Sequence, residues 1–326
     1  MKNIVALAGG VGGAKLALGL YHHLQTTQIS KPAAERKIKE LTIIGNTGDD
    51  LELFGVRICP DLDTLLYTLA GLANPVTGWG IEGDTFATFE MLKRYGEECW
   101  FQLGDRDFAT HLLRTQMLRA GKGLTEVTTQ LTEKLGIGCR LLPMCDEDVR
   151  TIVQTAESGE LPFQEYFVRR QARETVRGLR FEGAENATLS NAVRQAIAEA
   201  DLIVVCPSNP YLSIWPILAV PQMKETLSAS EAPIVVVSPI VGGMALKGPA
   251  AAIMRSLGGE ETASALAVAR LYAGWAQGFV LDQQDREDEE AIRALGFKTL
   301  VTNTIMKGTP DKARLALEIL GHYKTF

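Results

Sequence analysis

The chain has 326 residues, of which 46% are hydrophobic and 22% charged, and its formal net charge is −6. This length fits about two domains or one large α/β unit with an insertion, and the composition is typical of a globular protein with an apolar core. The negative charge argues against sequence-independent binding of nucleic acid, although a local site can still bind a small anion.

The first part of the chain reads as the opening of a doubly wound α/β sheet. Residues 2–8 form an apolar run that ends at glycines, residues 14–24 carry leucines at helical spacing, and residues 41–45 form a second apolar run. This pattern predicts a strand, a glycine-rich turn, a helix and a second strand. The polar stretch 26–39, which contains a proline, is predicted to be a surface loop.

The whole chain predicts an α/β fold that is Rossmann-like, with a mostly parallel sheet and helices on both faces. Residues 1–58 and 139–326 are expected to form the core, and residues 59–138 a helical insertion that contributes to the active site. Within the core, residues 139–181 look strand-like, but their assignment stays open between strand and helix. Later strands are predicted at 201–206, 234–237, 278–281 and 298–301, with a closing helix from Thr309. Ligands of open α/β sheets bind beyond the carboxyl ends of the strands, so function is expected in the turns there.

Residues 8–15, AGGVGGAK, form the first of these turns. They are not a dinucleotide fingerprint, because Lys15 stands where the third glycine belongs and the acidic residues Asp49 and Asp50 follow too late. The backbone amides of the turn are still expected at a helix N-terminus, where the helix dipole favours anions. We therefore predict that the turn binds phosphate; the alternative is a tight turn that only allows strand and helix to pack closely.

An acidic cluster follows the second predicted strand, in the stretch NTGDDLELFGVRICPDLD. Its four aspartates are Asp49, Asp50, Asp61 and Asp63. Mg²⁺ prefers a few carboxylates together with water and phosphate oxygens, so a metal site is one interpretation. The other is structural, with a turn at the first pair and helix caps at the second. These residues alone do not decide between the two.

Further candidates lie in later turns. The stretch LGDRDFATH places Arg106 before a helix, where it could bind phosphate bidentately or form only an exposed ion pair. His111 in the same stretch has no visible partner and is interpreted as structural. In the turn PSNP, Ser208 and Asn209 offer a hydroxyl and an amide suited to a base or a ribose. Three aromatic residues could flank a planar ring or belong to the core: Trp79, Trp100 and Phe101.

The cysteines and the N-terminus indicate a cytoplasmic protein. Five cysteines are present, and none forms a Cys-x-x-Cys pair, which fits reduced thiols better than disulfides or a zinc site. The apolar run at the N-terminus is too short to span a membrane and lacks a cleavage pattern.

The sequence has no Gly-x-Ser-x-Gly elbow, which disfavours covalent nucleophilic catalysis.

Eight motifs, in this order along the chain, resemble one known family. They are AGGVGGAK, NTGDD, CPDLDTLLYTLAG, WGIEGDTF, LGDRDFATHLLR, PSNP, SPIVGG and KGPA. From residue 3 to residue 320 the chain resembles the 2-phospho-L-lactate transferase family of coenzyme F-420 biosynthesis (CofD-type). No single motif is decisive, but eight in register are highly specific.

The resemblance implies a Rossmann-like fold with a helical insertion and a Mg²⁺-dependent transferase. Members of the family transfer a 2-phospho-L-lactyl or phosphoenolpyruvyl group from a guanosine diphosphate-linked donor to the ribityl hydroxyl of the deazaflavin Fo, and GMP leaves. They are typically dimers, so a homodimer is expected, without a nucleic-acid or membrane partner. The sequence looks closer to the members that use phosphoenolpyruvate. Lactate and glycerate variants of the three-carbon group stay open, and so does guanine against another base.

The resemblance and the residues together give a set of expected site residues. The expected catalytic residues are Lys15, which also holds donor phosphates, Asp63, which orients or deprotonates the acceptor hydroxyl, and Arg106, which neutralises charge. The expected Mg²⁺ ligands are Asp49, Asp50 and Asp63. The expected substrate-binding residues are Gly10, Gly12, Gly13, Asp61, Thr64, Asp105, Ser208, Asn209 and Pro210.

Two other functions are compatible with parts of the sequence. A related family of nucleotide-sugar-binding regulators shares the glycine turn and is thought to transfer nothing, but the Asp-Leu-Asp-Thr and Leu-Gly-Asp-Arg-Asp stretches argue against it. A nicotinamide-dependent oxidoreductase needs an intact fingerprint and an acidic residue for the ribose, and the sequence lacks both.

Overall fold

The computed structural model describes residues 3–29, 41–245, 250–258, 263–322 and 324. Of the predicted loop 26–39, residues 30–39 lie outside this described part, as do residues 247–249 of the motif KGPA. The prediction was wrong for residues 26–29, which continue the first helix. The helix can extend this far because the helix-breaking proline of the stretch occurs only at position 32.

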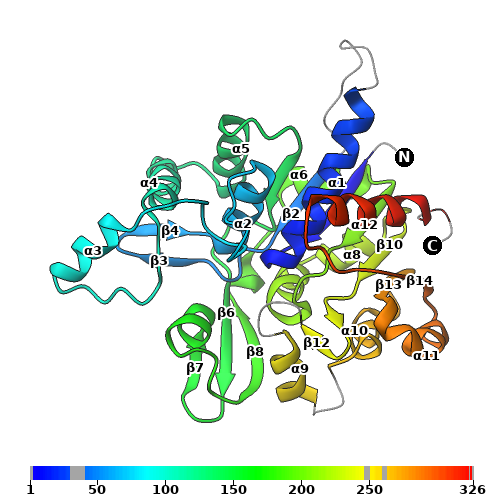
Figure 1. The fold of residues 1–326 in the computed structure, drawn as a ribbon. Coiled ribbons are helices and arrows are strands. Elements are labelled where there is room, and N and C mark those ends of the chain that lie inside the picture. Colours follow the sequence, from blue (N-terminus) through cyan, green and yellow to red (C-terminus); the bar gives the residue numbers. More distant parts are fainter. Residues whose placement is uncertain (1–2, 30–40, 246–249, 259–262, 323, 325–326) are drawn as a thin grey trace.

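Seven parallel strands form the central sheet, in the order β14-β13-β10-β9-β1-β2-β5 (Figure 1). They are β1 (Ile4–Ala8), β2 (Leu41–Gly45), β5 (Arg140–Pro143), β9 (Leu202–Val205), β10 (Ile234–Val237), β13 (Gly278–Asp282) and β14 (Lys298–Thr302). The chain builds one side of the sheet from β1 to β5 and the other side from β9 to β14, so the strand order reverses between β1 and β9. This confirms the predicted Rossmann-like α/β fold. The reversal is the position at which open α/β sheets bind ligands.

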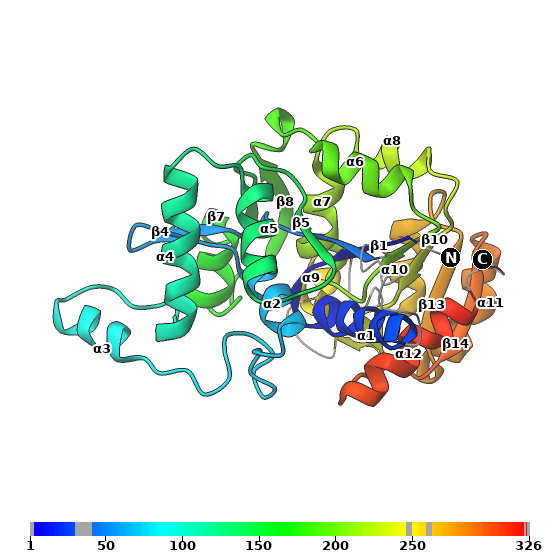
Figure 2. The ribbon, with the colours of Figure 1, turned by 90° about the horizontal axis from the view of Figure 1, so that it is seen from above.

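Both faces of the sheet are buried, and β1 shows this residue by residue. Ile4, Ala6 and Ala8 pack into one apolar core, whereas Val5 and Leu7 pack into the other. Successive side chains of a strand point to opposite faces, so a strand covered on both sides reads as a continuous apolar run. Figure 2 shows α1 and α12 on one side of the sheet and α6 and α8 on the other.

Helices from distant parts of the sequence make up the two layers. The first face packs against α1 (Gly10–Ile29), α2 (Pro60–Leu69), α5 (Leu124–Lys134) and α12 (Thr309–His322). The second packs against α6 (Asn191–Ala198), α7 (Trp215–Ala219), α8 (Met223–Ser228), α9 (Ala250–Gly258), α10 (Ala265–Tyr272) and α11 (Glu289–Ala294). In the part of the chain that the structure describes, none of the helices has the length and apolar character that crossing a membrane requires.

Residues 59–138 are largely helical, as predicted. Between α2 and α5 they contain α3 (Ala87–Arg94) and α4 (Asp105–Arg119), which extend away from the sheet (Figure 1). The helices α2 and α5 instead belong to the layer that covers the sheet. The division into a core and an insertion therefore stays a prediction.

Three small antiparallel sheets accompany the parallel sheet. A hairpin of β3 (Leu51–Leu53) and β4 (Val56–Ile58) precedes α2, and β11 (Ile240–Val241) pairs with β12 (Met244–Ala245) after β10. The stretch 139–181, which the sequence left open, contains more strand than helix. After β5, it continues into a separate sheet of β6 (Arg150–Thr155), β7 (Gly159–Pro162) and β8 (Val176–Glu182), ordered β7-β6-β8. A short π-helical segment, η2 (Glu165–Arg169), lies between β7 and β8.

The contact between α1 and α12 depends on a glycine inside a helix. Gly19 lies in the middle of α1, where alanine is normally favoured by roughly 0.5–1 kcal/mol. A Cβ at this position would clash with the backbone carbonyl of Lys312 in α12, so glycine allows the two helices to approach closely.

We predict that Gly19→Ala lowers the free energy of unfolding by about 1–3 kcal/mol, because a backbone atom cannot move aside cheaply. Thermal unfolding followed by circular dichroism measures the change. Gly321→Ala is the matched control, since Gly321 is also in a helix but a Cβ there meets nothing within 4 Å. An unchanged or higher Tm for Gly19→Ala would contradict the prediction.

Candidate active site

The turn between β1 and α1 packs closely against the loop that follows β9. Gly10 has a φ of +62°, a left-handed conformation that glycine adopts without strain. A Cβ at Gly12 would clash with the carbonyl oxygen of Pro207, and a Cβ at Gly13 would clash with Oγ of Ser208. The glycines are therefore needed for packing, whatever else the turn binds.

A carboxylate of the protein itself caps the start of α1. The amide of Gly10 donates a hydrogen bond of 2.7 Å to Oδ1 of Asp61. The preceding amide, of Gly9, donates to Oγ of Ser208 over 3.1 Å. The first four amides of a helix have no partner within the helix. Asp61 takes up the first of them, so an incoming phosphate would bind the amides that follow it.

A cavity of about 620 Å³ lies at the reversal of strand order. The turn after β1, the helices α2 and α4, and the loops after β9, β10 and β14 all contribute to its wall. Most of the predicted site residues line it: Gly10, Gly12, Lys15, Asp49, Asp61, Asp63, Thr64, Ser208 and Asn209. The wall does not include five others, all within the described residues: Gly13, Asp50, Asp105, Arg106 and Pro210.

In the turn Leu-Gly-Asp-Arg-Asp, the two predicted site residues Asp105 and Arg106 lie off the cavity wall. Asp105 accepts hydrogen bonds from the amides of Ala87 and Thr88, over 3.0 and 2.9 Å, and so caps α3. The side chain of Arg106 is exposed. The turn brings Asp107 to the wall instead. A role of Asp105 in substrate binding and of Arg106 in catalysis stays a prediction.

The loop after β9 also has a structural function. Oδ1 of Asn209 accepts hydrogen bonds from the amides of Tyr211 and Leu212 and caps a π-helical turn, η4 (Pro210–Ile214). Pro210 is the first residue of this turn and lies off the wall because it opens the segment that leads to α7. Asn209 and Ser208 remain on the wall.

Asp49 is the carboxylate best suited to bind a cation. It lines the cavity, and its Oδ1 is buried without a hydrogen-bond partner among the described residues. Burial raises the pKa of Asp49 well above its ordinary value, and the nearby carboxylates of Asp61 and Asp50 raise it further. A divalent cation would reverse both effects by offsetting the negative charge.

Asp50 faces an arginine instead of the cavity. Nη2 and Nε of Arg57 lie 3.1 and 3.3 Å from Oδ2 of Asp50. Burial raises the pKa of Asp50 to about 7, even though Arg57 opposes the shift. The role of Asp50 as a Mg²⁺ ligand remains a prediction. Its Oδ2 is already bound by Arg57.

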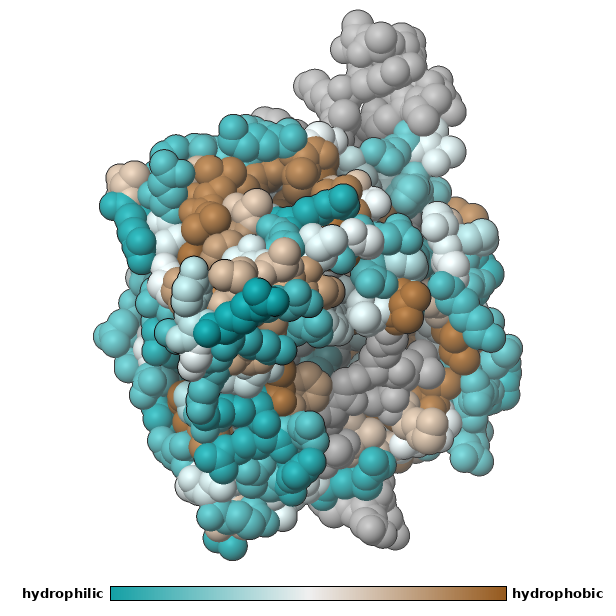
Figure 3. Space-filling model, turned by 60° about the vertical axis from the view of Figure 1, so that its left-hand side comes forward, coloured by the Kyte–Doolittle hydropathy of each residue, from teal (hydrophilic) through white to brown (hydrophobic). Residues whose placement is uncertain are grey.

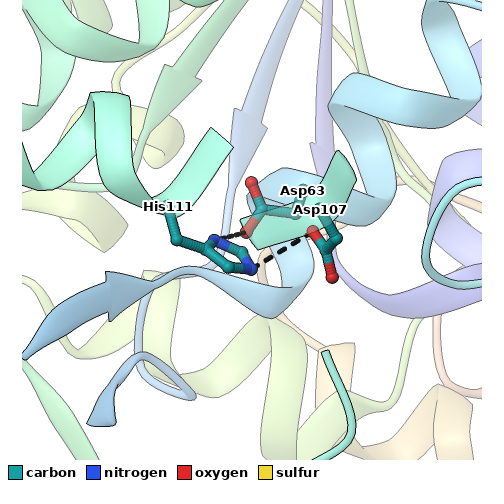
Figure 4. Close-up of side chains that lie close together, drawn as sticks. All are labelled: Asp63, Asp107 and His111. Carbon is teal, nitrogen blue, oxygen red and sulfur yellow. Dashed lines mark ion pairs between the residues drawn. The ribbon is translucent and has the colours of Figure 1, made fainter. Parts of the chain in front are cut away.

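Asp63 is part of a buried polar cluster between α2 and α4 (Figure 4). Both its oxygens are bound by the guanidinium of Arg114. The imidazole of His111 lies between two carboxylates, with Nδ1 at 3.6 Å from Oδ2 of Asp63 and Nε2 at 3.2 Å from Oδ1 of Asp107. Three of these residues, Asp63, Asp107 and His111, line the cavity.

Most of this cluster was not predicted from the sequence. His111 was interpreted as structural, and neither Asp107 nor Arg114 was among the predicted site residues. The signal was present, because Asp107, His111 and Arg114 are spaced by four and three residues and therefore share one face of a helix. The donor atoms of Asp63, Asp107 and His111 lie within 4.8 Å of one another, which makes them a second set that could hold a metal ion.

Aromatic side chains line the remainder of the cavity. Trp79, Trp100 and Phe101 contribute to the wall, so they are available to a planar ring as the sequence suggested. The rings of Phe163 and Phe167 stack with centroids 5.4 Å apart and also line it. On the face shown in Figure 3, hydrophobic side chains reach the surface among hydrophilic ones. Of the residues on the cavity wall, Trp79 is 46% exposed.

Lys15 lines the cavity and connects two of its walls. It lies in the first turns of α1, and its Nζ donates a hydrogen bond of 2.9 Å to the carbonyl oxygen of Met306. Met306 follows β14 and lines the cavity as well. To hold a donor phosphate, Lys15 would have to share or exchange this contact.

The fold and the site define a doubly wound α/β protein. It combines a potential anion-binding helix start and buried carboxylates in one cavity at the reversal of strand order. A family model described as 2-phospho-L-lactate transferase CofD matches residues 4–305. The chain belongs to this family of transferases.

Relatives support the family across the whole length. The chain is 42% identical over 326 residues to a phosphoenolpyruvate transferase of Kitasatospora aureofaciens, with 97% of each chain covered. It is 43% identical over 324 residues to a phosphoenolpyruvate transferase of Streptomyces griseus, with 97% of this chain and 98% of that one covered. A crystal structure of a UPF0052 family protein from Bacillus halodurans covers 98% of each chain with a TM-score of 0.64. At 15% identity, that likeness supports the fold alone.

We predict that Asp49→Asn raises the Tm in metal-free buffer, and more at pH 8 than at pH 5. A raised pKa means that the folded state binds this proton more tightly than the unfolded state. The stability of the native protein therefore falls as the pH rises above the ordinary aspartate pKa, and a neutral amide removes that cost. A gain of about 1 kcal/mol corresponds to roughly 2–4 °C.

Differential scanning calorimetry at the two pH values measures the effect. Glu52→Gln is the matched control, because Glu52 is exposed and lies off the cavity wall. The prediction is wrong if Asp49→Asn and Glu52→Gln show the same change in Tm between pH 5 and pH 8.

Proposed function

We propose that this protein transfers a phosphoenolpyruvyl group from a guanosine diphosphate-linked donor to the ribityl hydroxyl of the deazaflavin Fo and releases GMP, in coenzyme F-420 biosynthesis. One observation carries the proposal: in a chain of this transferase family, the N-terminus of α1 and the carboxylates of Asp49, Asp61 and Asp63 line the same cavity. The names of the relatives support enolpyruvyl over lactyl as the transferred group.

The donor diphosphate is expected at the glycine turn. The amides that follow Gly10 and the positive end of α1 attract phosphate oxygens, and Lys15 adds a charge from the first turns of the same helix. The neighbouring carboxylates repel a diphosphate, so binding requires a cation between the two sets of oxygens. This requirement supports the predicted dependence on Mg²⁺.

The residues present fit Mg²⁺, a hard cation that takes oxygen ligands. Asp49 would hold it through the buried Oδ1 that has no partner among the described residues. Asp50 and Asp63 were predicted as further ligands, and arginines already bind both carboxylates. The bound ion would neutralise phosphate charge in the ground state and in the transition state.

The acceptor is expected between the aromatic residues and Asp63. A planar deazaflavin can stack on aromatic rings of the wall such as Trp79 or Phe167. We expect its ribityl chain to extend from there toward α2. The ribityl hydroxyl oxygen attacks the phosphorus that carries the enolpyruvyl group, and the bond from that phosphorus to the GMP oxygen breaks. Asp63 orients the hydroxyl and accepts its proton, while GMP leaves as the anion.

We predict that the purified protein, with Mg²⁺, Fo and the enolpyruvyl guanosine donor, forms GMP and the phosphoenolpyruvyl adduct of Fo. Mass spectrometry identifies both products. Asp63→Asn and Asp49→Asn should each lower kcat by about 100-fold or more, since loss of a group that positions or stabilises a transition state typically costs 10²–10⁴-fold. Glu52→Gln should stay at the wild-type rate.

The same assay separates the alternatives. If the donor binds but neither GMP nor an adduct forms, the protein is a nucleotide-binding regulator and the proposed transfer is wrong. If the adduct contains a lactyl or glyceryl group, only the three-carbon assignment is wrong. Full activity of both aspartate variants would refute the assigned residues.

We predict that Mg²⁺ raises the Tm of the wild-type protein and leaves that of Asp49→Asn nearly unchanged. A ligand that binds only the native state stabilises it by mass action. Calorimetry is done at Mg²⁺ concentrations from zero to about ten times the dissociation constant. The free energy of unfolding of the wild-type protein should rise by up to about 1.4 kcal/mol. Equal gains for wild type and variant would place the ion elsewhere.

A further inference from the structure

A closed polar network connects the first two turns of α2 to one face of α4. On α2 it includes Asp63 and, four residues later, Tyr67. On α4 it includes Asp107, His111 and Arg114. All five side chains are buried. The network is not explained by packing alone, because an apolar interface of the same shape would avoid the cost of burying charges.

Arg114 fixes the orientation of the Asp63 carboxylate. Its side chain is 2% exposed, and its two terminal nitrogens bind the two oxygens of Asp63 in a bidentate pair. Oδ2 of Asp63 also accepts a hydrogen bond of 3.2 Å from the amide of Cys59. A carboxylate offers about four acceptor positions, so these three bonds leave capacity for a group in the cavity.

His111 fixes Arg114 in turn. Nη1 of Arg114 lies 3.2 Å from Nδ1 of His111, and a guanidinium can only donate, so Nδ1 is the acceptor. The ring proton then belongs on Nε2, which lies at an ion-pair distance of 3.2 Å from Oδ1 of Asp107 but makes no hydrogen bond among the described residues. The hydroxyl of Tyr67 donates to the same oxygen over 2.7 Å, which closes the network back onto α2.

We infer that Arg114 and His111 are positioning residues, which hold the Asp63 carboxylate in the orientation that the transfer requires. The inference rests on the proposed function of Asp63 and adds two residues that act through it. Arg114 sets the carboxylate plane directly, and His111 helps to set the guanidinium plane together with the carbonyl oxygen of Arg57, 3.3 Å from the same Nη1. A displacement of about 1 Å at a reacting group can cost roughly 100-fold in rate, so residues behind Asp63 control the rate without touching the substrate.

The same side chains are less suited to a metal ion. Each nitrogen of His111 lies nearest a different carboxylate, so an ion that used one nitrogen would have to draw in the other carboxylate from as far as 4.8 Å. The guanidinium of Arg114 lies against Asp63 and His111, and its positive charge repels a cation there. Metal binding by these residues is therefore the alternative to the positioning role, and the NMR measurement with Zn²⁺ tests it.

Two substitutions of His111 separate its two nitrogens. In His111→Asn, the side-chain oxygen can replace Nδ1 as the acceptor for Arg114, whereas the contact of Nε2 with Asp107 is lost. In His111→Gln, the longer side chain reaches Asp107, whereas the acceptor for Arg114 is lost. We expect His111→Gln and Arg114→Lys to lower kcat by about 10–100-fold with KM changed less than threefold, and His111→Asn to lower kcat less than tenfold.

Two other kinetic outcomes would contradict the inference. Equal kcat values for His111→Asn and His111→Gln, or losses that follow the Tm of each variant, would show that His111 is merely structural. A rise in KM with unchanged kcat would show that the network binds substrate directly. Either result overturns the inference.

A second measurement does not depend on activity. Nitrogen-15 NMR of the wild-type protein should show His111 with its proton on Nε2, the signal being assigned by its loss in His111→Asn. A proton on Nδ1 overturns the inference, and so does a large shift of one ring nitrogen on addition of one equivalent of Zn²⁺. If the wild type transfers nothing to Fo, the proposed function fails, and this spectrum still decides whether the network exists as described.

Discussion

The hydrogen bond between the amide of Gly10 and the carboxylate of Asp61 links the two segments on which the cavity depends. It joins the start of α1 to the start of α2, and Oδ2 of the same carboxylate accepts a hydrogen bond from Asn46 at the end of β2. Gly9 has no room for a Cβ, because Asp61 and Ser213 lie against it. The glycine turn is therefore not a free loop that awaits a phosphate. The turn is already in contact with an acidic side chain, the carboxylate of Asp61.

This contact sets the electrostatic problem of the site. Four aspartates gather beside a helix start that attracts anions, and arginines bind two of them, Asp50 by Arg57 and Asp63 by Arg114. Asp49 and Asp61 have no arginine partner among the described residues, and burial raises the pKa of both. Asp49 and Asp61 are therefore the two carboxylates of the cavity whose charge no described arginine offsets, and this is why a divalent cation is proposed beside an anionic substrate. The two arginines thus leave Asp49 and Asp61 as the carboxylates most available to the proposed cation.

The sequence predicted what depends on local pattern and missed what depends on tertiary contact. Apolar runs located the strands, because a strand buried on both faces needs no alternation. The carboxyl ends of parallel strands lie at the same edge of a sheet. The glycine turn after β1 and the acidic stretch after β2 therefore predicted where the cavity lies. No local pattern identifies Arg57 or Arg114 as the partner of a particular aspartate, since each pair spans different elements. The interpretation of His111 as structural overlooked Asp107 and Arg114 on the same face of α4. That this face meets Asp63 on α2 is a tertiary contact that no local pattern shows.

The motif Leu-Gly-Asp-Arg-Asp shows how a strong sequence signal can act indirectly. Asp105 accepts hydrogen bonds from the first amides of α3, and Asp84, just before α3, accepts them from the first amides of α4. These reciprocal caps fix the two helices relative to each other and set the rotation of α4 about its axis. That rotation turns the face with His111 toward α2 instead of solvent. The two aspartates therefore support Asp63 from outside the cavity, which explains why the motif accompanies the site although most of it lies off the wall.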